Sequence, residues 1–323
     1  MTVSTLGQHV SLAAYVGRAQ SKLGDYQLQM ASGKIAEVYS GLGSSAPTAI
    51  NLHNRVQQMD GYRQIIQTVD SRAAAMDVSL HRIHASVTAV KTETIKSEFE
   101  GYDLTLLQAR ANDGVRELET ALNLNLNGRY LFSGHMIDTV PMVDSATVKG
   151  LVSAAIVPGD TATTITNIDA VFATTTNFYQ GDNGEVTARI DTATEVDYGI
   201  TGDDAAFVDA AKGLYLLAVL DPATTDPDEY DVLRDWALGK LDEGQFGVNH
   251  LQAANGIVRQ TLETVDQQHA QVTVAMKTNI ADLEDADIYE TINRIAMIKS
   301  QLEASYMMTA QLREMSLVNY LMG

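Results

Sequence analysis

The sequence predicts a mainly α-helical fold with a β-rich insert, in which the N- and C-terminal segments form a long coiled-coil bundle attached to a central α+β domain. Apolar residues repeat every 3.5 positions in the first 125 residues, and the same repeat returns after Gly247. Between these segments, residues 136–204 are rich in Thr, Val, Ala, Asp and Gly. A chain of 323 residues with 45% hydrophobic content is long enough to bury a substantial core.

The segment 50–95 has the clearest periodicity, because apolar or small residues alternate there in steps of four and three for about four heptads. We call such a row of positions a seam. At about 1.5 Å per residue, this helix would be roughly 65–75 Å long. Its seam positions are Tyr62, Ile66, Val69, Ala73, Met76, Leu80, Ile83, Val87 and Val90.

Two further helices are predicted in this part of the chain, one before the long helix and a less regular one at 104–122. Gly7, Gly17 and Gly24 interrupt the first helix, and each costs about 1 kcal/mol relative to alanine. This helix should therefore be weak until it packs against a partner. Its seam positions are Leu12, Val16, Ala19, Leu23, Tyr26 and Met30.

In the middle of the chain, residues 161–166 and 185–190 have the composition of short strands, and 181–184 that of a turn. Shorter helices are expected at 205–220 and 230–241, on either side of a Pro- and Asp-rich turn.

After Gly247 the heptad spacing continues for more than four heptads and includes three polar positions, which in coiled coils fix register and partner. The seam positions are Leu251, Asn255, Val258, Leu262, Val265, His269, Val272, Met276, Asn279 and Leu283. A last helix reaches the end of the chain with apolar positions Ile288, Ile292, Ile295, Ile298, Leu302, Tyr306, Leu312 and Met315.

These segments predict five parts of the chain. They are an N-terminal assembly helix (1–45), the N-terminal part of a helical rod (46–135), an outward-facing β-rich insert (136–245), the C-terminal part of the rod (246–286) and a C-terminal assembly helix (287–323).

The composition excludes several partners and compartments. A net charge of −19 disfavours nucleic acid and anionic membranes, and most of the charge lies at 138–243, where 20 acidic residues face five basic ones. No apolar run reaches the ~18 residues of a membrane helix, and the N-terminus lacks a basic leader with an apolar core. The chain has no cysteine, which excludes disulfides and thiolate chemistry.

No reaction centre is recognisable, so we expect no enzyme activity, no metal site and no cofactor. His81 and His84 have a spacing that could bring two imidazoles to one helix face, but a zinc site needs more ligands. The acidic residues at 221–231 lack the spacing and the central glycine of a calcium loop. The Met-rich segment 306–315 suits either a core or an adaptable contact between subunits.

Several short motifs resemble the hook–filament junction family of flagellin-like proteins. They are Asn127-Gly-Arg-Tyr-Leu-Phe-Ser-Gly134, Phe178-Tyr-Gln-Gly-Asp-Asn-Gly184, Glu284-Asp-Ala-Asp287, Leu302-Glu-Ala-Ser-Tyr306 and Ser316-Leu-Val-Asn-Tyr-Leu321. Ser32-Gly33 is similar to another family motif, although Lys34 stands where the family usually has arginine. The resemblance covers residues 1–135 and 246–323, and more loosely the insert.

The resemblance implies a structural subunit of the bacterial flagellum, exported without a cleaved signal peptide and located outside the cell. Its expected partners are copies of itself, a neighbouring hook-associated protein, flagellin and an export chaperone. The expected contacts between subunits are the seam of the first helix (Leu12 to Met30) with Ile295, Leu302, Tyr306, Leu312 and Met315 of the last. A filament flagellin is the alternative, and a secreted module that binds a ligand through the insert is a third possibility.

Overall fold

The computed structural model describes residues 5–99 and 101–321, and its contacts divide the chain into two compact units. We call residues 1–59 with 270–323 the terminal unit, and residues 60–269 the central unit. Two long helices, α2 (Ala46–Lys96) and α7 (Pro227–Glu284), contribute to both units. The mainly α-helical fold is as predicted, and α2 confirms the long helix expected at 50–95.

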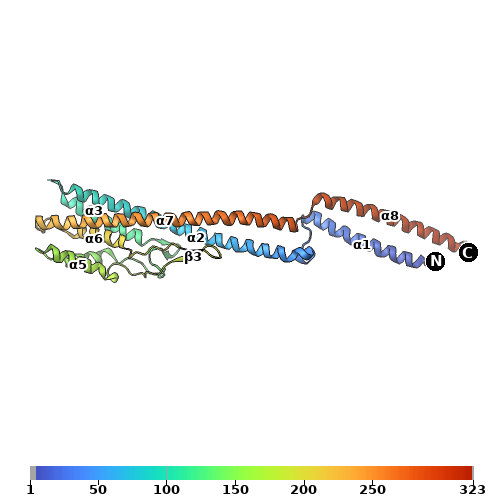
Figure 1. Ribbon diagram of the computed structural model, residues 1–323, viewed down its shortest axis with the longest axis horizontal. Coiled ribbons are helices and arrows are strands. Elements are labelled where there is room, and N and C mark those ends of the chain that lie inside the picture. The colour runs from blue at the N-terminus through green and yellow to red at the C-terminus, as the bar shows by residue number, and fades with distance from the viewer. Residues whose placement is uncertain (1–4, 100, 322–323) are drawn as a thin grey trace. The chain divides into compact units, whose positions relative to one another are not determined.

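The terminal unit is helical throughout its regular elements. It contains α1 (Thr5–Ser32), the 3-10 helix η1 (Tyr39–Ser45), one end each of α2 and α7, and α8 (Ile288–Leu321). The first and last helices of the chain, α1 and α8, pack side by side (Figure 1). The two ends of the sequence therefore meet in one helix pair.

The central unit combines helices with two small antiparallel hairpins. Its elements besides the long helices are α3 (Leu104–Leu122), β1 (Asn125–Leu126), β2 (Arg129–Tyr130), α4 (Ser145–Ala155), α5 (Thr161–Ala173), η2 (Thr175–Asn177), β3 (Thr187–Arg189), β4 (Glu195–Asp197) and α6 (Ala205–Val219). Asn125 pairs with Tyr130 in the first hairpin, and Ala188 pairs with Val196 in the second.

The main core of the central unit forms around α6, which contacts α3, α4 and α5. Phe207, Leu214 and Tyr215 of α6 are buried in it, together with the α2 seam from Met76 to Val90. A second cluster joins Ile66 and Val69 of α2 to Leu262 of α7 and to the β3–β4 hairpin. Burial at about 25 cal/mol per Å² makes these apolar faces the main source of stability in the central unit.

The strand predicted at 161–166 is wrong, because these residues begin helix α5. The threonines suggested a strand, but Asp160 caps the helix by accepting a hydrogen bond from the Thr163 amide at 2.9 Å. Thr164, Ile168 and Phe172, spaced four apart, form the buried face of the helix. Burial of this face and the cap together outweigh the weak helix propensity of threonine.

The separate helix predicted at 230–241 is also wrong in its extent, since α7 continues for 58 residues without interruption. Two glycines within α7, Gly244 and Gly247, permit close packing between helices. A Cβ atom at Gly244 would lie 2.5 Å from the backbone nitrogen of Ala210, and one at Gly247 would lie 2.5 Å from the Ala206 side chain. Glycine thus lets α6 approach α7 closely.

Alanine substitutions in α7 should therefore have opposite effects at two glycines. Gly244→Ala should destabilise the central unit by roughly 1–3 kcal/mol, because its Cβ would overlap the α6 backbone. Gly256→Ala has no heavy atom within 4 Å of its added Cβ and should stabilise the helix by about 1 kcal/mol. Urea unfolding of the two variants checks this, and a Gly244→Ala protein as stable as wild type would contradict the close packing.

The seam of α7 follows the predicted positions up to His269 and then shifts. Leu262, Asn255 and His269 are buried, and Leu251, Val258 and Val265 are partly buried. Val272 is 43% exposed, while the next residue, Thr273, is 4% exposed. An α-helix with 3.6 residues per turn drifts relative to a strict heptad by about 20° per repeat, so a buried row moves to the neighbouring position. Met276 remains partly buried.

The polar seam residues of α7 make specific hydrogen bonds. The Asn255 amide nitrogen donates to the Ala73 carbonyl at 2.9 Å, and His269 Nε2 lies 2.9 Å from the Ile190 carbonyl. The His269 ring also stacks on Tyr62. The Asn255 bond favours one register of α2 against α7, and the His269 bond fixes the segment after β3 on α7, because a shift would leave buried polar groups unpaired.

Candidate assembly surface of the terminal helices

The contact between α1 and α8 uses part of the two predicted seams. Ala19, Ile298 and Leu302 form its buried centre, with Val16, Leu23 and Tyr26 packed around them. Hydrogen bonds cross the pair from Tyr15 Oη to Gln301 Oε1 at 3.3 Å, from Gln20 Nε2 to Tyr306 Oη at 2.8 Å and from Arg294 Nη1 to Tyr26 Oη at 3.1 Å. The seam thus serves first to join the two ends of one chain.

Large apolar side chains also remain exposed on these helices, including Tyr15 and Tyr306, whose hydroxyl groups form hydrogen bonds across the pair. We call them the outer apolar residues: Val10, Tyr15, Leu28 and Met30 of α1, and Ile288, Tyr289, Ile292, Met297, Tyr306, Met307 and Met308 of α8. Tyr289 and Met307 are 83% and 68% exposed and lie 18 residues apart, which is five helical turns, so they share one side of α8. Met297 and Met308, three turns apart, share another.

A helix that is apolar on several sides is normally buried on all of them. Contiguous exposed apolar surface on a protein marks a site of association. Helix α8 covers only one side of α1, and α1 covers only one side of α8. The remaining sides of both helices can therefore contact other polypeptides. The terminal helices thus present a candidate assembly surface.

The predicted assembly residues divide between the internal contact and the outer surface. Ala19, Ile295 and Leu302 are buried within the pair, and Leu12, Val16, Leu23 and Tyr26 are partly buried. Met30 and Tyr306 are 47% and 50% exposed. Leu312 and Met315 belong to α8, but their side chains lie outside those that the structure describes.

The chain segments on either side of this helix pair meet at a short backbone junction. Gly33, with φ of +71°, ends α1, and the Ile35 amide donates to the Glu284 carbonyl at 2.7 Å. In return the Ala286 amide donates to the Gly33 carbonyl at 2.8 Å. This antiparallel bridge ties the exit of α1 to the entry of α8. Asp287 then caps α8 by accepting from the Glu290 amide.

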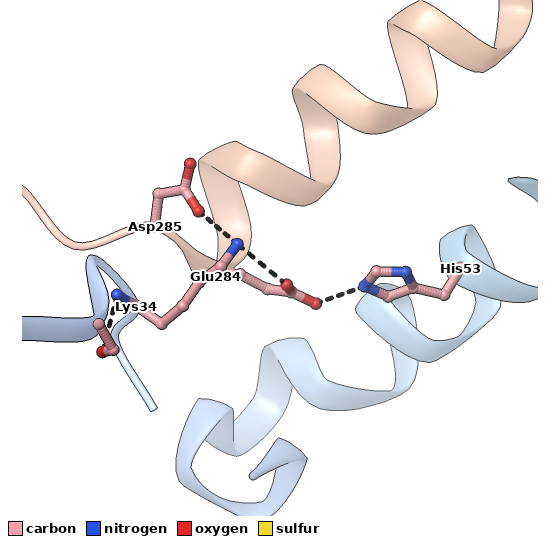
Figure 2. A network of polar contacts seen from close by, with 5 residues as sticks. Lys34, His53, Glu284 and Asp285 are labelled. Atoms are coloured by element: carbon pink, nitrogen blue, oxygen red, sulfur yellow. Dashed lines mark hydrogen bonds and ion pairs between the residues drawn. The ribbon is translucent and has the colours of Figure 1, made fainter. Parts of the chain in front are cut away.

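Four side chains reinforce the junction (Figure 2), and we call Lys34, His53, Glu284 and Asp285 the junction cluster. Lys34 Nζ lies 2.6 Å from Asp285 Oδ1 and 3.5 Å from Glu284 Oε2, and His53 Nε2 lies 2.7 Å from Glu284 Oε1. The hydrogen bond to Asp285 is the main cause that raises the pKa of Lys34 above its ordinary value. Glu284 is 14% exposed and links the lysine at the end of α1 to the histidine of α2.

Sequence reasoning missed Lys34 and His53 as members of this cluster. The motifs Ser32-Gly33 and Glu284-Asp-Ala-Asp287 were recognised, but only the fold shows that they are hydrogen-bonded to each other. The sequence held one indication of this contact, because one motif follows the first helix and the other precedes the last.

Glu284→Gln should loosen the junction without unfolding the central unit. Loss of the carboxylate weakens its contacts with Lys34 and His53, and we expect a loss of about 1 kcal/mol of local stability, or about fivefold faster hydrogen exchange at Ile35 and Ala286. Asp282→Asn, an exposed change of the same charge on the same helix, should leave that exchange unchanged. Equal exchange in both variants would contradict a structural role for Glu284.

The stability of the junction should depend on pH through the protonation of Lys34. Because its folded-state pKa is raised, its contribution is complete below the ordinary lysine pKa of 10.5 and is lost as the pH rises through the higher folded value. Wild-type exchange at the junction should thus accelerate above about pH 10.5 beyond the intrinsic rate.

The two motifs from the centre of the chain also meet each other. Asn127 and Gly128, both with positive φ, form the two-residue turn between β1 and β2. Further on, the Tyr179 hydroxyl donates to the Phe132 and Asp182 carbonyls at 3.0 and 2.7 Å, and Asp182 Oδ1 accepts from the His135 amide at 2.6 Å. Segments 127–134 and 178–184 therefore form one packed structure.

The two histidines considered as metal ligands contact different partners. His81 Nδ1 lies 3.0 Å from the Asp77 carbonyl of its own helix, and His84 Nε2 lies 3.4 Å from Gln245 Nε2 of α7. Among the residues described, no group of three or more His, Cys, Asp or Glu is placed to hold a metal ion. No helix within the described ranges has the length and apolar character needed to cross a membrane.

The structure defines the class of the protein as a mainly helical chain whose two ends pair and leave apolar residues exposed. Family models show to which family the chain belongs. The model of the bacterial flagellin N-terminal helical region matches residues 3–136, and that of the C-terminal helical region matches 238–321. The chain belongs to the bacterial flagellin family, which is a family of structural proteins.

Solved structures share the fold. A chain from Vibrio parahaemolyticus described as a flagellar hook-associated protein is 11% identical with a TM-score of 0.56, over 74% of this chain and 97% of that one. FlgL from Bacillus cereus is 15% identical with a TM-score of 0.54, over 72% and 99%. Flagellar hook-associated protein 3 from Legionella pneumophila is 12% identical with a TM-score of 0.54, over 72% and 98%. No curated protein sequence matches at a significant level.

Proposed function

We propose that this protein joins the hook to the filament of the bacterial flagellum. The observation that carries the proposal is the terminal helix pair, which satisfies its internal seam and still exposes apolar residues such as Tyr289 and Met307. Many identical contacts between these surfaces would supply the association energy of a ring or tube.

The junction role is favoured over that of a filament flagellin by the central motifs. Residues 127–134 and 178–184, which resemble the junction family, pack together through Tyr179 and Asp182. Solved structures of hook-associated proteins are matched over nearly their whole length. A filament subunit remains the second candidate, because the flagellin family models cover both helical flanks.

The proposal assigns a place to each part of the chain. Residues 1–45 and 287–323 form the assembly helices, residues 136–245 face outward, and the protein works outside the cell after export without a cleaved signal peptide. Its partners are other copies of itself, a neighbouring hook-associated protein, flagellin and an export chaperone.

A strain lacking the gene tests the proposal. Cells with hooks but no filaments, which release flagellin monomers into the medium, are the expected result. Shorter or fewer filaments would favour the filament-subunit candidate, and unaltered flagella would overturn both.

A further inference from the structure

A groove of about 690 Å³ in the central unit is lined by two arginines, Arg72 and Arg129. It lies between α2 and the β3–β4 hairpin, and β3 runs beside α2 in Figure 1. Its lining includes Gln64 and Arg72 of α2, Arg129 of β2, and Glu185 and Tyr198 next to the hairpin. These residues come from three elements that are far apart in the sequence.

Neither guanidinium in the groove has a carboxylate within 4.0 Å among the residues that the structure describes. Arg72 Nη1 donates to the Tyr198 hydroxyl at 2.8 Å, which leaves its other N–H groups for a ligand. By contrast, Arg63 on the same helix pairs with Asp266, and Arg259 on α7 pairs with Asp70.

The groove also contains a hydroxyl that can donate to an anion, and its lining includes one carboxyl group, that of Glu185. Tyr198 is 6% exposed, and because its oxygen accepts from Arg72, its own O–H can donate into the groove. Both ring nitrogens of His135 have protein neighbours, since Nε2 lies 2.9 Å from the Glu185 carbonyl and Nδ1 lies 3.9 Å from the Asp182 carboxylate. Guanidinium groups and a hydroxyl are hydrogen-bond donors of the kind that carboxylate oxygens accept, and a guanidinium can bind both oxygens of one carboxylate.

We propose that this groove binds carboxylates of the acidic segment 221–231 of a second copy of the chain, as a contact between neighbouring subunits. The segment comprises the turn before α7 and the first residues of that helix, and it contains five acidic residues and no basic one. Asp221, Asp226 and Asp228 are exposed, as is Asp231, which pairs with Arg234 of its own helix at 2.7 Å. The charge of the segment is thus opposite to that of the groove. The inference rests on the proposed self-assembly, and adds to it a polar contact formed by the central unit.

The direct test uses a synthetic peptide of residues 221–231 titrated against the full chain at low salt. Arg72→Gln with Arg129→Gln should weaken binding at least tenfold, and raising the salt concentration should weaken wild-type binding in the same direction. Arg110→Gln, an exposed arginine of α3, is the matched control and should have no effect. Arg129→Gln alone should weaken binding as well, which keeps the test valid if loss of the Arg72 bond to Tyr198 disturbs the fold. Equal affinity of the double variant and wild type would overturn the proposal, as would an equal loss in the control.

Complementation separates this inference from the proposed function. In the strain lacking the gene, the double arginine variant should restore filaments that detach at lower salt than those of wild type. Attachment equal to wild type at every salt concentration would overturn only the groove contact. A deletion strain with unaltered flagella would instead overturn the proposed function.

Discussion

Replacing Leu302 by aspartate should abolish attachment of filaments while leaving the central unit folded. Leu302 is 6% exposed in the seam between α1 and α8, and an uncompensated charge there should cost the helix pair about 3–5 kcal/mol. Without the pair, the two ends of the chain no longer form a common surface. Motility of a complemented deletion strain measures the effect, and hydrogen exchange in α3 and α6 reports on the central unit.

Leu302→Met is the matched control, because it keeps the volume and apolar character of the side chain and should cost less than about 1.5 kcal/mol. Motility should then be retained. Full motility with Leu302→Asp would show that the internal seam is not needed for assembly.

Met307→Asp should produce an equally large loss of assembly for a different reason. Met307 is 68% exposed, so the change should alter the stability of the isolated chain by no more than about 0.5 kcal/mol. Between copies, however, the new carboxylate would be buried without a partner. Thermal unfolding of the monomer and filament counts on complemented cells measure the two effects separately.

The control for this position is Met307→Leu, which keeps the surface apolar and should assemble normally. Assembly of Met307→Asp at the wild-type level would show that this side of α8 faces solvent in the flagellum. The two aspartate variants thus distinguish contacts within one chain from contacts between chains.

The sequence was most informative where one face of a long helix is buried. The spacing from Ile66 to Val90 predicted α2, and buried positions in the structure follow it. The prediction of a strand at 161–166 was wrong because threonine composition was weighed above the four-residue spacing of Thr164, Ile168 and Phe172. The helix expected at 230–241 is too short compared with α7, and the contact of the α7 glycines with α6 is not visible in a local pattern.

The candidate site was only partly predictable for a related reason. Periodicity identifies apolar residues such as Leu302 and Tyr306, but it does not say whether a partner is the other end of the chain or another copy. Polar contacts such as His53 with Glu284, or Arg72 with Tyr198, join residues far apart in the sequence. They depend on tertiary geometry, so no local pattern predicts them.

The backbone bridge at the junction has a mechanical consequence. A force that pulls on the α1–α8 pair is transmitted to α2 and α7 through two chain segments, the one that follows α1 and the one that precedes α8. The hydrogen bonds from Ile35 to Glu284 and from Ala286 to Gly33 hold these two segments together. Tension during rotation of the flagellum would then be divided between both segments, and neither α1 nor α8 would bear the load alone.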